Sequence, residues 1–193
     1  MSANTYHHGD LRTAMIEKGI EMIIKDGAKT LSLRKLAAAC GVSHAAPYSH
    51  FANKDDLLAA IEGHITRQFA AVLKDAVGHA GETPEGLYHM CCAYVLFFAR
   101  NPAYFKFIFI HSDITVGDGY VYEPYDFYRE FMTKMFDKMG YPQEQRVKTM
   151  YAQWAMIHGL ASIAVMGDGE DLALWEEWVP DMLSTNYLVF KTK

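Results

Sequence analysis

The sequence predicts an all-α protein, and two observations support that fold class. Apolar residues recur at helical spacing along most of the chain, as Ile16, Ile20 and Ile24 do near its start. No sustained alternation of apolar and polar residues and no Asn-Gly hairpin signal indicates a strand. We therefore expect three short helices at the N-terminal end, joined by a long helix to a larger helical body.

The composition is that of an ordinary folded protein, with 51% hydrophobic and 21% charged residues in a chain of 193. No apolar run approaches the roughly 18 residues that a membrane span needs. The N-terminal stretch also lacks the apolar segment of a signal peptide. The expected location is therefore the cytoplasm, without a membrane partner.

Motifs that would indicate an enzyme, a metal site or a cofactor are absent from the sequence. There is no Gly-rich phosphate loop, no Gly-x-Ser-x-Gly and no His-Glu-x-x-His. Cys40, Cys91 and Cys92 have neither zinc spacing nor a good disulfide pattern, so free thiols are expected. We expect no catalytic residue, no metal and no cofactor.

The ends of the first two helices are marked by their capping residues. A helix over about 9–26 carries one apolar stripe, and Gly27 stands where a left-handed C-terminal cap belongs. Ser32 suits the N-cap of the second helix, because its hydroxyl can accept a hydrogen bond from the first-turn backbone. Gly41 would close that helix after two turns.

A third helix of two turns is expected over residues 44–50, with Ser43 as its cap. A helix this short is unstable alone, so it needs anchors, and Val42 and Phe51 are the apolar residues beside it. Its exposed face would carry small and polar side chains. Such a face allows a helix to approach a DNA groove closely.

The remaining residues are expected to form a helical body. Asn53 caps a long helix over 54–77, and the segments 78–86 and 112–119 are the most loop-like. The further helices are expected at about 84–100, 102–111, 120–139, 143–166 and 171–190.

Three motifs follow one another within residues 39–58: Ala-Cys-Gly-Val-Ser, Pro-Tyr-Ser-His-Phe and Asn-Lys-Asp-Asp-Leu-Leu. Together they resemble the DNA-binding domain of the TetR/AcrR family of regulators, over residues 8 to about 65. The resemblance implies a helix-turn-helix domain with its recognition helix at 44–50. The residues matching its DNA-contacting positions are Arg34, Ser43, His44, Ala45, Ala46, Tyr48, His50 and Lys54. One departure is Ser49, because this position is often basic in the family.

A second motif, Gln-Trp-Ala-Met-Ile-His-Gly at residues 153–159, resembles the Trp-x-x-x-His-Gly (WHG) element of one type of TetR C-terminal domain. Whether Trp154 and His158 face a pocket or a dimer interface stays open at this point. The resemblance implies a DNA-binding domain at residues 1–53, with the long helix starting just after it. It implies a helical ligand-binding and dimerisation domain at residues 54–193.

The charge is unevenly distributed along the chain. The net charge is −5, yet residues 1–67 hold eight Lys and Arg against seven Asp and Glu. So mild an excess gives no strong attraction to phosphates. DNA affinity would therefore depend on a few placed contacts and on dimerisation.

The second half is rich in side chains that suit a helix–helix interface or an apolar pocket. The residues predicted for a dimer interface are Ala155, Gly159, Ser162, Trp175, Trp178, Met182 and Leu183. The residues predicted to bind an effector are Phe98, Phe105, Phe109, Tyr125, Tyr128, Met132, Met150, Trp154 and His158.

The function that these features indicate is sequence-specific regulation of transcription. The expected protein is a homodimeric repressor that binds double-stranded DNA at a near-palindromic operator. A small apolar or aromatic effector would release it. The alternatives are a TetR-like activator, and a helical small-molecule-binding protein without a DNA function.

Overall fold

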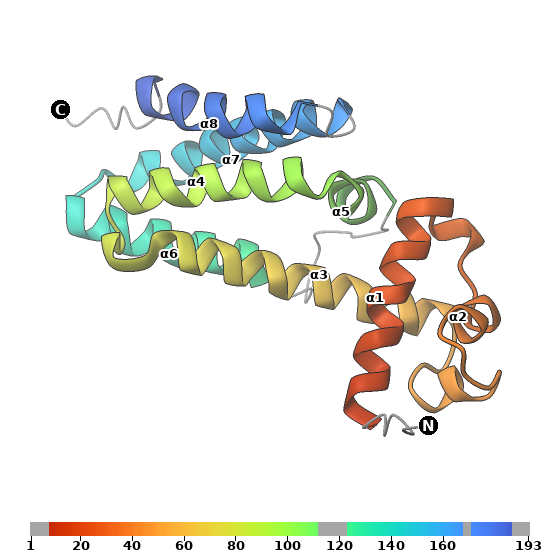
Figure 1. Cartoon of the computed structure of the whole chain (residues 1–193). Helices are drawn as coiled ribbons and strands as arrows, with labels where there is room; N and C mark the ends of the chain where they lie inside the picture. The colour runs from red at the N-terminus through yellow and green to blue at the C-terminus, as the bar shows by residue number, and fades with distance from the viewer. Residues whose placement is uncertain (1–7, 112–122, 168–170, 187–193) are drawn as a thin grey trace. The chain divides into compact units, whose positions relative to one another are not determined.

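The computed structural model describes residues 8–111, 123–167 and 171–186 (Figure 1). All regular structure in these ranges is helical, as the sequence predicts. The chain divides into two compact units, Met1–Ile65 and Thr66–Lys193. No helix in the described ranges combines the length and apolar character needed to cross a membrane.

The first unit is built from short helices around one apolar core. It contains α1 (His8–Asp26), α2 (Leu33–Ala39), a 3₁₀ turn η2 (Ala46–Ser49) and the start of α3 (Lys54–Val77). A further 3₁₀ turn, η1 (Ala28–Thr30), joins α1 to α2. Side chains that are almost completely buried come from each part, and they include Met15, Ile16, Leu36, Phe51, Leu57 and Ile61.

Two of the predicted helix caps are confirmed. The Ser32 hydroxyl accepts a hydrogen bond from the Lys35 backbone N–H at 3.3 Å. The Asn53 side-chain oxygen accepts one from the Asp56 N–H at 2.9 Å, and the Asp56 carboxylate accepts one from the Ala52 N–H at 2.9 Å. These two bonds satisfy one backbone donor in the first turn of α3 and one just before its N-cap.

The prediction of a left-handed helical cap at Gly27 is wrong in part. Its φ is +82°, which favours glycine, but its ψ of 152° lies far from the left-handed helical region. Gly27 instead precedes η1, whose residue Thr30 donates its backbone N–H to the Gly27 carbonyl at 3.2 Å.

The predicted α-helix at residues 44–50 is wrong in its type. The segment is a turn followed by η2, and Ala45 rather than Ser43 occupies the N-cap position. The cause is Pro47, which has no N–H to donate to the Ser43 carbonyl four residues earlier. That carbonyl accepts from the Ala46 N–H at 3.0 Å instead, which is the shorter 3₁₀ spacing.

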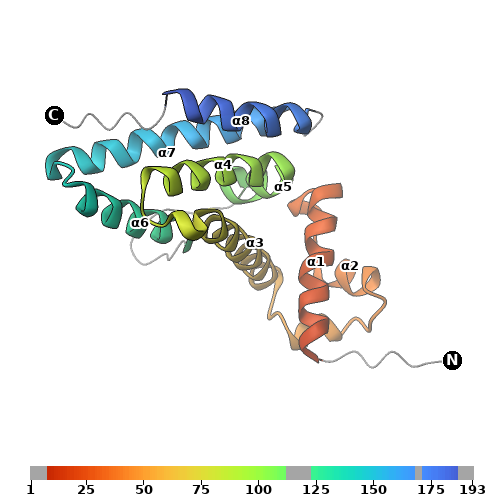
Figure 2. The same ribbon diagram turned by 60° about the vertical axis from the view of Figure 1, so that its left-hand side comes forward.

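The second unit is a helical bundle with α4 (Pro84–Arg100) at its centre. α4 contacts both α7 (Gln143–Met166) and α8 (Leu172–Asn186). Figures 1 and 2 both show α7 and α8 lying side by side along α4. The end of α3 and α6 (Glu123–Met139) complete the bundle.

One predicted helix of the second unit changes type along its length. Residues 102–111 form α5 (Pro102–Phe105) followed by η4 (Lys106–His111), which has the wider π-helical hydrogen bonding. The predicted loop at 112–119 lies outside the described residues, as do parts of the predicted 120–139 and 171–190 helices.

Candidate nucleic-acid interface and ligand pocket

The segment from Ser43 to Ser49 lies at the surface of the first unit and is anchored in the core by buried residues. Pro47 and Phe51 are buried, and the Arg12 guanidinium lies 5.3 Å from the centre of the Phe51 ring. Tyr48, between those two anchors, is 60% exposed. The backbone is therefore fixed by buried residues while the outward side chains remain available.

The residues predicted to contact DNA differ in their exposure. Arg34, Ser43, His44, Ala45 and Tyr48 are exposed, whereas Ala46, His50 and Lys54 are half-buried.

Lys54 and His50 have surroundings that the sequence did not indicate. The Lys54 ammonium donates a hydrogen bond to the Lys29 carbonyl at 3.1 Å, so it ties the start of α3 to η1. The His50 Nε2 atom is buried and has no hydrogen-bond partner among the described residues. Ser49, at the position that is often basic, donates its hydroxyl to the Ala46 carbonyl at 2.7 Å.

Four of the residues predicted to bind an effector form an aromatic cluster in the second unit. Phe98, Phe105, Phe109 and His158 have neighbouring ring centres 4.7–5.6 Å apart. His158 Nδ1 lies 2.9 Å from the Tyr94 hydroxyl. Burial lowers the pKa of His158, so the ring is neutral near pH 7.

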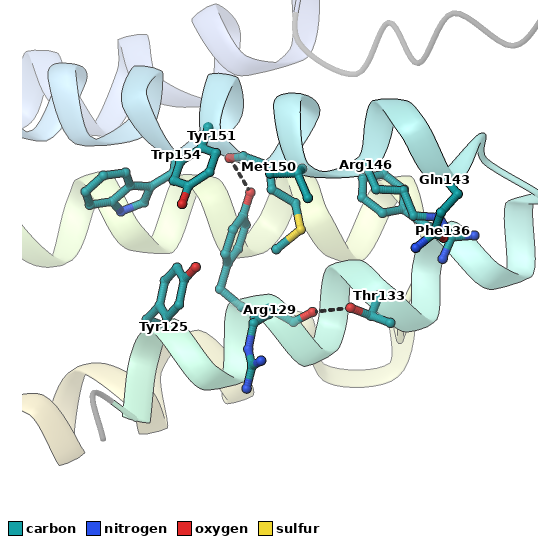
Figure 3. A pocket seen from close by; sticks show the side chains of 11 residues that line it. Tyr125, Arg129, Thr133, Phe136, Gln143, Arg146, Met150, Tyr151 and Trp154 are labelled. Carbon is teal, nitrogen blue, oxygen red and sulfur yellow. Dashed lines mark hydrogen bonds between the residues drawn. The ribbon is translucent and has the colours of Figure 1, made fainter. Parts of the chain in front are cut away.

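A separate groove with a cavity volume of about 320 Å³ lies between α6 and α7 (Figure 3). Its lining residues are Tyr125, Tyr128, Arg129, Thr133, Phe136, Gln143, Arg146, Val147, Met150, Tyr151 and Trp154. The volume lies at the lower end of the range for small-molecule sites, roughly 300–1,000 Å³.

The structure thus divides the predicted effector residues between two places. Tyr125, Tyr128, Met150 and Trp154 line the groove, and Met132 is fully buried without lining it. The other four form the aromatic cluster. Sequence reasoning missed the remaining lining residues, although 125, 129, 133 and 136 on α6 and 143, 147, 151 and 154 on α7 recur at helical spacing.

Trp154 stands at the junction of the groove and the aromatic cluster. Its ring centre lies 5.2 Å from that of His158, one helical turn further along α7. His158 is half-buried, whereas Trp154 is 36% exposed and lines the groove. Gly159 has open space around it, because a Cβ added there would meet no atom within 4 Å.

The two arginines of the groove are held very differently. The Arg146 side chain is only 17% exposed and donates to the Asp137 carboxylate at 2.5 Å and to the Tyr141 carbonyl at 3.1 Å. The Arg129 side chain is 62% exposed, and its contact with the Asp126 carboxylate is 3.4 Å long. Arg146 joins the end of α6 to α7, whereas Arg129 has a weak contact within one helix.

The Tyr128 hydroxyl joins α6 to α7 by a hydrogen bond. Its hydroxyl donates to the Met150 carbonyl at 3.0 Å, across the groove (Figure 3). Burial raises the pKa of Tyr128. This phenol is therefore neutral, and its hydroxyl is engaged in the hydrogen bond between the two helices.

Several large apolar residues of α7 and α8 are exposed, and we refer to them together as the α7–α8 apolar face. Its large members are Met156, Ile163, Met166, Leu174 and Trp178. Of the predicted interface residues, Ala155 and Trp178 are exposed and Gly159, Ser162, Trp175 and Met182 are half-buried. The prediction for Leu183 needs correction, because its side chain is 1% exposed and belongs to the unit's own core.

No group of three or more His, Cys, Asp or Glu suited to a metal ion occurs among the described residues. Cys40, Cys91 and Cys92 are free thiols, and burial raises the pKa of Cys91 to about 12.

Two family models match this chain. One is described as bacterial regulatory proteins of the tetR family and matches residues 15–61. The other is described as a tetracyclin repressor-like C-terminal domain and matches residues 87–179. A search of curated protein sequences gave no significant match.

Solved structures with the same architecture cover nearly the whole chain. A protein of unknown function from Rhodococcus sp. RHA1 is 25% identical, with a TM-score of 0.71 over 93% of this chain and 96% of that one. The fatty acid degradation regulator FadR from Bacillus halodurans is 15% identical, with a TM-score of 0.65 over 96% and 99%. A TetR/AcrR regulator from Thermobifida fusca YX-ER1 is 18% identical, with a TM-score of 0.61 over 92% and 98%.

The last two structures, below 25% identity, show the fold alone, and the two family models show the kinship. The model matched at residues 87–179 does not identify the WHG subtype, which stays a prediction. The chain belongs to the TetR family of bacterial transcriptional regulators.

Proposed function

We propose that this TetR-family regulator is a homodimeric repressor that binds a near-palindromic operator and leaves it when a small molecule occupies the second unit. The observation that carries the proposal is the exposed segment 43–49, supported from below by Pro47 and Phe51. An exposed surface that includes Ser43, Ala45 and Ser49 suits close approach to base edges. The predicted DNA-binding domain at residues 1–53 supplies that surface.

Within this proposal the exposed side chains have distinct roles. His44 and Ala45 would contact base edges, where a methyl group or an imidazole can distinguish bases. Tyr48 and Lys54 would contact phosphates, which fix the position of the protein without reading sequence. Lys54 would exchange its bond to the Lys29 carbonyl for a phosphate oxygen.

Dimerisation is supported by the α7–α8 apolar face. Met166 is 77% exposed and Trp178 is 48% exposed, and apolar patches of this kind mark interaction surfaces. A two-fold dimer would place the two copies of segment 43–49, which we call the reading segment, about one DNA turn apart, roughly 34–36 Å. The second domain, residues 54–193, would provide the interface and the effector site.

Control by an effector is supported by the groove between α6 and α7. A molecule bound there would release DNA only if it prefers the non-binding arrangement of the dimer. A complete switch requires a preference on the order of 10⁴-fold. A protein that works on DNA in this way would act in the cytoplasm, without catalysis of its own.

A gel-shift experiment with DNA from upstream of the protein's own gene tests the proposal. We expect binding at low salt, with an affinity that falls steeply as salt rises because phosphate contacts release counterions. Tyr48→Ala should weaken binding to all sequences, and His44→Ala should change the base preference. Arg67→Ala, an exposed cation of α3 far along the sequence from the reading segment, is the control.

The absence of a gel shift with this DNA at low salt would contradict the repressor proposal. A reporter gene under the control of this DNA distinguishes a repressor from an activator. Repression on binding supports the proposal, and increased transcription indicates the TetR-like activator instead.

A further inference from the structure

The groove between α6 and α7 combines an apolar wall with positive charge. Met150, Trp154 and Val147 from α7 face Tyr125 and Phe136 from α6 across it. In Figure 3 the Tyr125 ring points toward α7, whereas the Arg129 side chain extends from α6 on the side away from α7. The groove therefore has an apolar wall, and Arg129 lines it from α6.

The charged side chains that line the groove are both arginines. Arg129 and Arg146 line it, and among the described residues no Asp or Glu does. Each guanidinium has a carboxylate partner outside the lining, Asp137 for Arg146 and Asp126 for Arg129. An anion in the groove would therefore have to bind the arginine whose own ion pair is the weaker.

Arg146 is an unsuitable partner for a ligand because it is already engaged. Its bonds to the Asp137 carboxylate and the Tyr141 carbonyl hold the end of α6 against α7. Among the described residues, Arg129 forms an ion pair only with Asp126, at 3.4 Å in an exposed setting, where such a pair contributes little. A ligand carboxylate can therefore replace Asp126 at Arg129 with a small loss, and the guanidinium can bind it in two-pronged geometry.

We propose that the α6–α7 groove binds a small amphipathic carboxylic acid, with its apolar body against Met150 and Trp154 and its carboxylate on Arg129. The inference rests on the proposed function, because it assigns a ligand class to the effector site. Asp126 acts as an internal competitor for Arg129. The charged end is fixed by the guanidinium, and a straight-chain or an aromatic body fits the same apolar wall.

The experiment measures binding of two acid–alcohol pairs to the full chain by calorimetry. The probes are decanoate with decanol, and 4-phenylbutanoate with 4-phenylbutanol. At least one acid should bind at least tenfold more tightly than its alcohol. Arg129→Gln should weaken acid binding about tenfold or more and leave alcohol binding unchanged. Asp126→Asn should tighten acid binding several-fold.

Lys134→Gln is the matched control, because it removes one positive charge from the same helix without touching the groove. Lys134 pairs with Glu130 at 2.6 Å, and it does not line the cavity. Thermal unfolding of each variant checks that the fold is intact, and Arg129→Lys should restore part of the affinity. The inference is overturned if neither acid binds at millimolar concentration, if acid and alcohol bind equally, or if Arg129→Gln behaves like Lys134→Gln.

Gel shifts with the same probes separate this inference from the proposed function. If acids bind through Arg129 but DNA affinity does not change, the groove binds carboxylic acids but does not control DNA binding. If DNA is released by a molecule that binds equally well to Arg129→Gln, an effector controls DNA binding but is not held by Arg129.

Discussion

At the scale of single residues, Pro47 determines the geometry of the segment that is proposed to read DNA. By lacking an N–H, it leaves the Ser43 carbonyl to the Ala46 N–H and shortens the helical spacing there. Because Pro47 is itself buried, it also anchors the turn that it creates. Pro47 therefore contributes to the backbone path of the segment both through its missing donor and through its burial.

Ser49 offers a test of how much positive charge limits DNA binding. Ser49→Arg should increase affinity for any DNA sequence, because it adds a phosphate contact at an exposed position. The slope of log affinity against log salt should become steeper by about 0.9 for each added contact, and so by about 1.8 for a dimer. A salt titration by gel shift measures this slope.

Ser49→Ala is the control for the lost hydroxyl, whose bond to the Ala46 carbonyl is exposed. It should change stability by no more than about 0.5 kcal/mol. An unchanged salt slope for Ser49→Arg would show that this position lies away from the phosphates.

At the scale of helices, a helix start that depends on a capping side chain could be predicted from the sequence. A helix type that depends on the pattern of backbone hydrogen bonds could not. Ser32 and Asn53 cap their helices through their own oxygen atoms, which are visible in sequence. The η2 turn was predicted as an α-helix because an early proline is tolerated in a helix whose other residues supply enough bonds. In a segment of two turns, one missing donor changes the whole hydrogen-bond pattern.

The candidate pocket was only partly predictable for a related reason. Aromatic residues at helical spacing led to the prediction that Tyr125 and Trp154 bind an effector, and both line the groove. Whether neighbouring side chains fill such a face or leave it open depends on how the helices pack. The periodicity of one helix carries no information about that packing. The arginines of the groove were missed because a charged residue at helical spacing is usually a solvated one.

Gly86, in the first turn of α4, tests a close approach between a helix and the loop before it. A Cβ at this position would lie 2.0 Å from the Gly81 carbonyl oxygen. That oxygen belongs to backbone and already accepts from the Thr83 N–H at 2.9 Å, so it cannot move freely. Gly86→Ala should therefore lower the free energy of unfolding by about 1–3 kcal/mol.

Urea unfolding followed by circular dichroism measures this loss. Glu85→Ala, at the exposed neighbouring position, should stay within about 0.5 kcal/mol of the unchanged protein. Equal stability of Gly86→Ala and Glu85→Ala would show that the Gly81 loop lies elsewhere in solution.

At the scale of the whole molecule, the proposed function requires two copies. The first unit holds seven Lys and Arg against seven Asp and Glu, so a single copy has little electrostatic attraction to DNA. The α7–α8 apolar face supplies a reason for pairing that does not depend on DNA. Affinity for an operator would then come from linking two weak contacts.

Charged substitutions on the α7–α8 apolar face test the dimer. Met166→Glu and Trp178→Glu should convert the protein to a monomer at micromolar concentration, because each would bury an unpaired carboxylate in the interface. Helix content should be unchanged, since both side chains are exposed in the single chain. Sedimentation velocity gives the oligomeric state.

Val147→Glu is the matched control, because Val147 is also exposed on α7 but borders the groove. It should leave the dimer intact. If the unchanged protein is a monomer, the dimer proposal is contradicted. A dimer that survives both substitutions would place the interface elsewhere.

The separation between buried anchors and exposed side chains at segment 43–49 has a consequence for how such a protein diversifies. Pro47 and Phe51 are buried, while His44, Ala45 and Tyr48 are exposed. Substitutions at the outward positions therefore cost little stability. Within the proposed role, the lineage can acquire new target sequences by changing these positions alone, and the same freedom makes them the natural sites for a library that retargets the regulator.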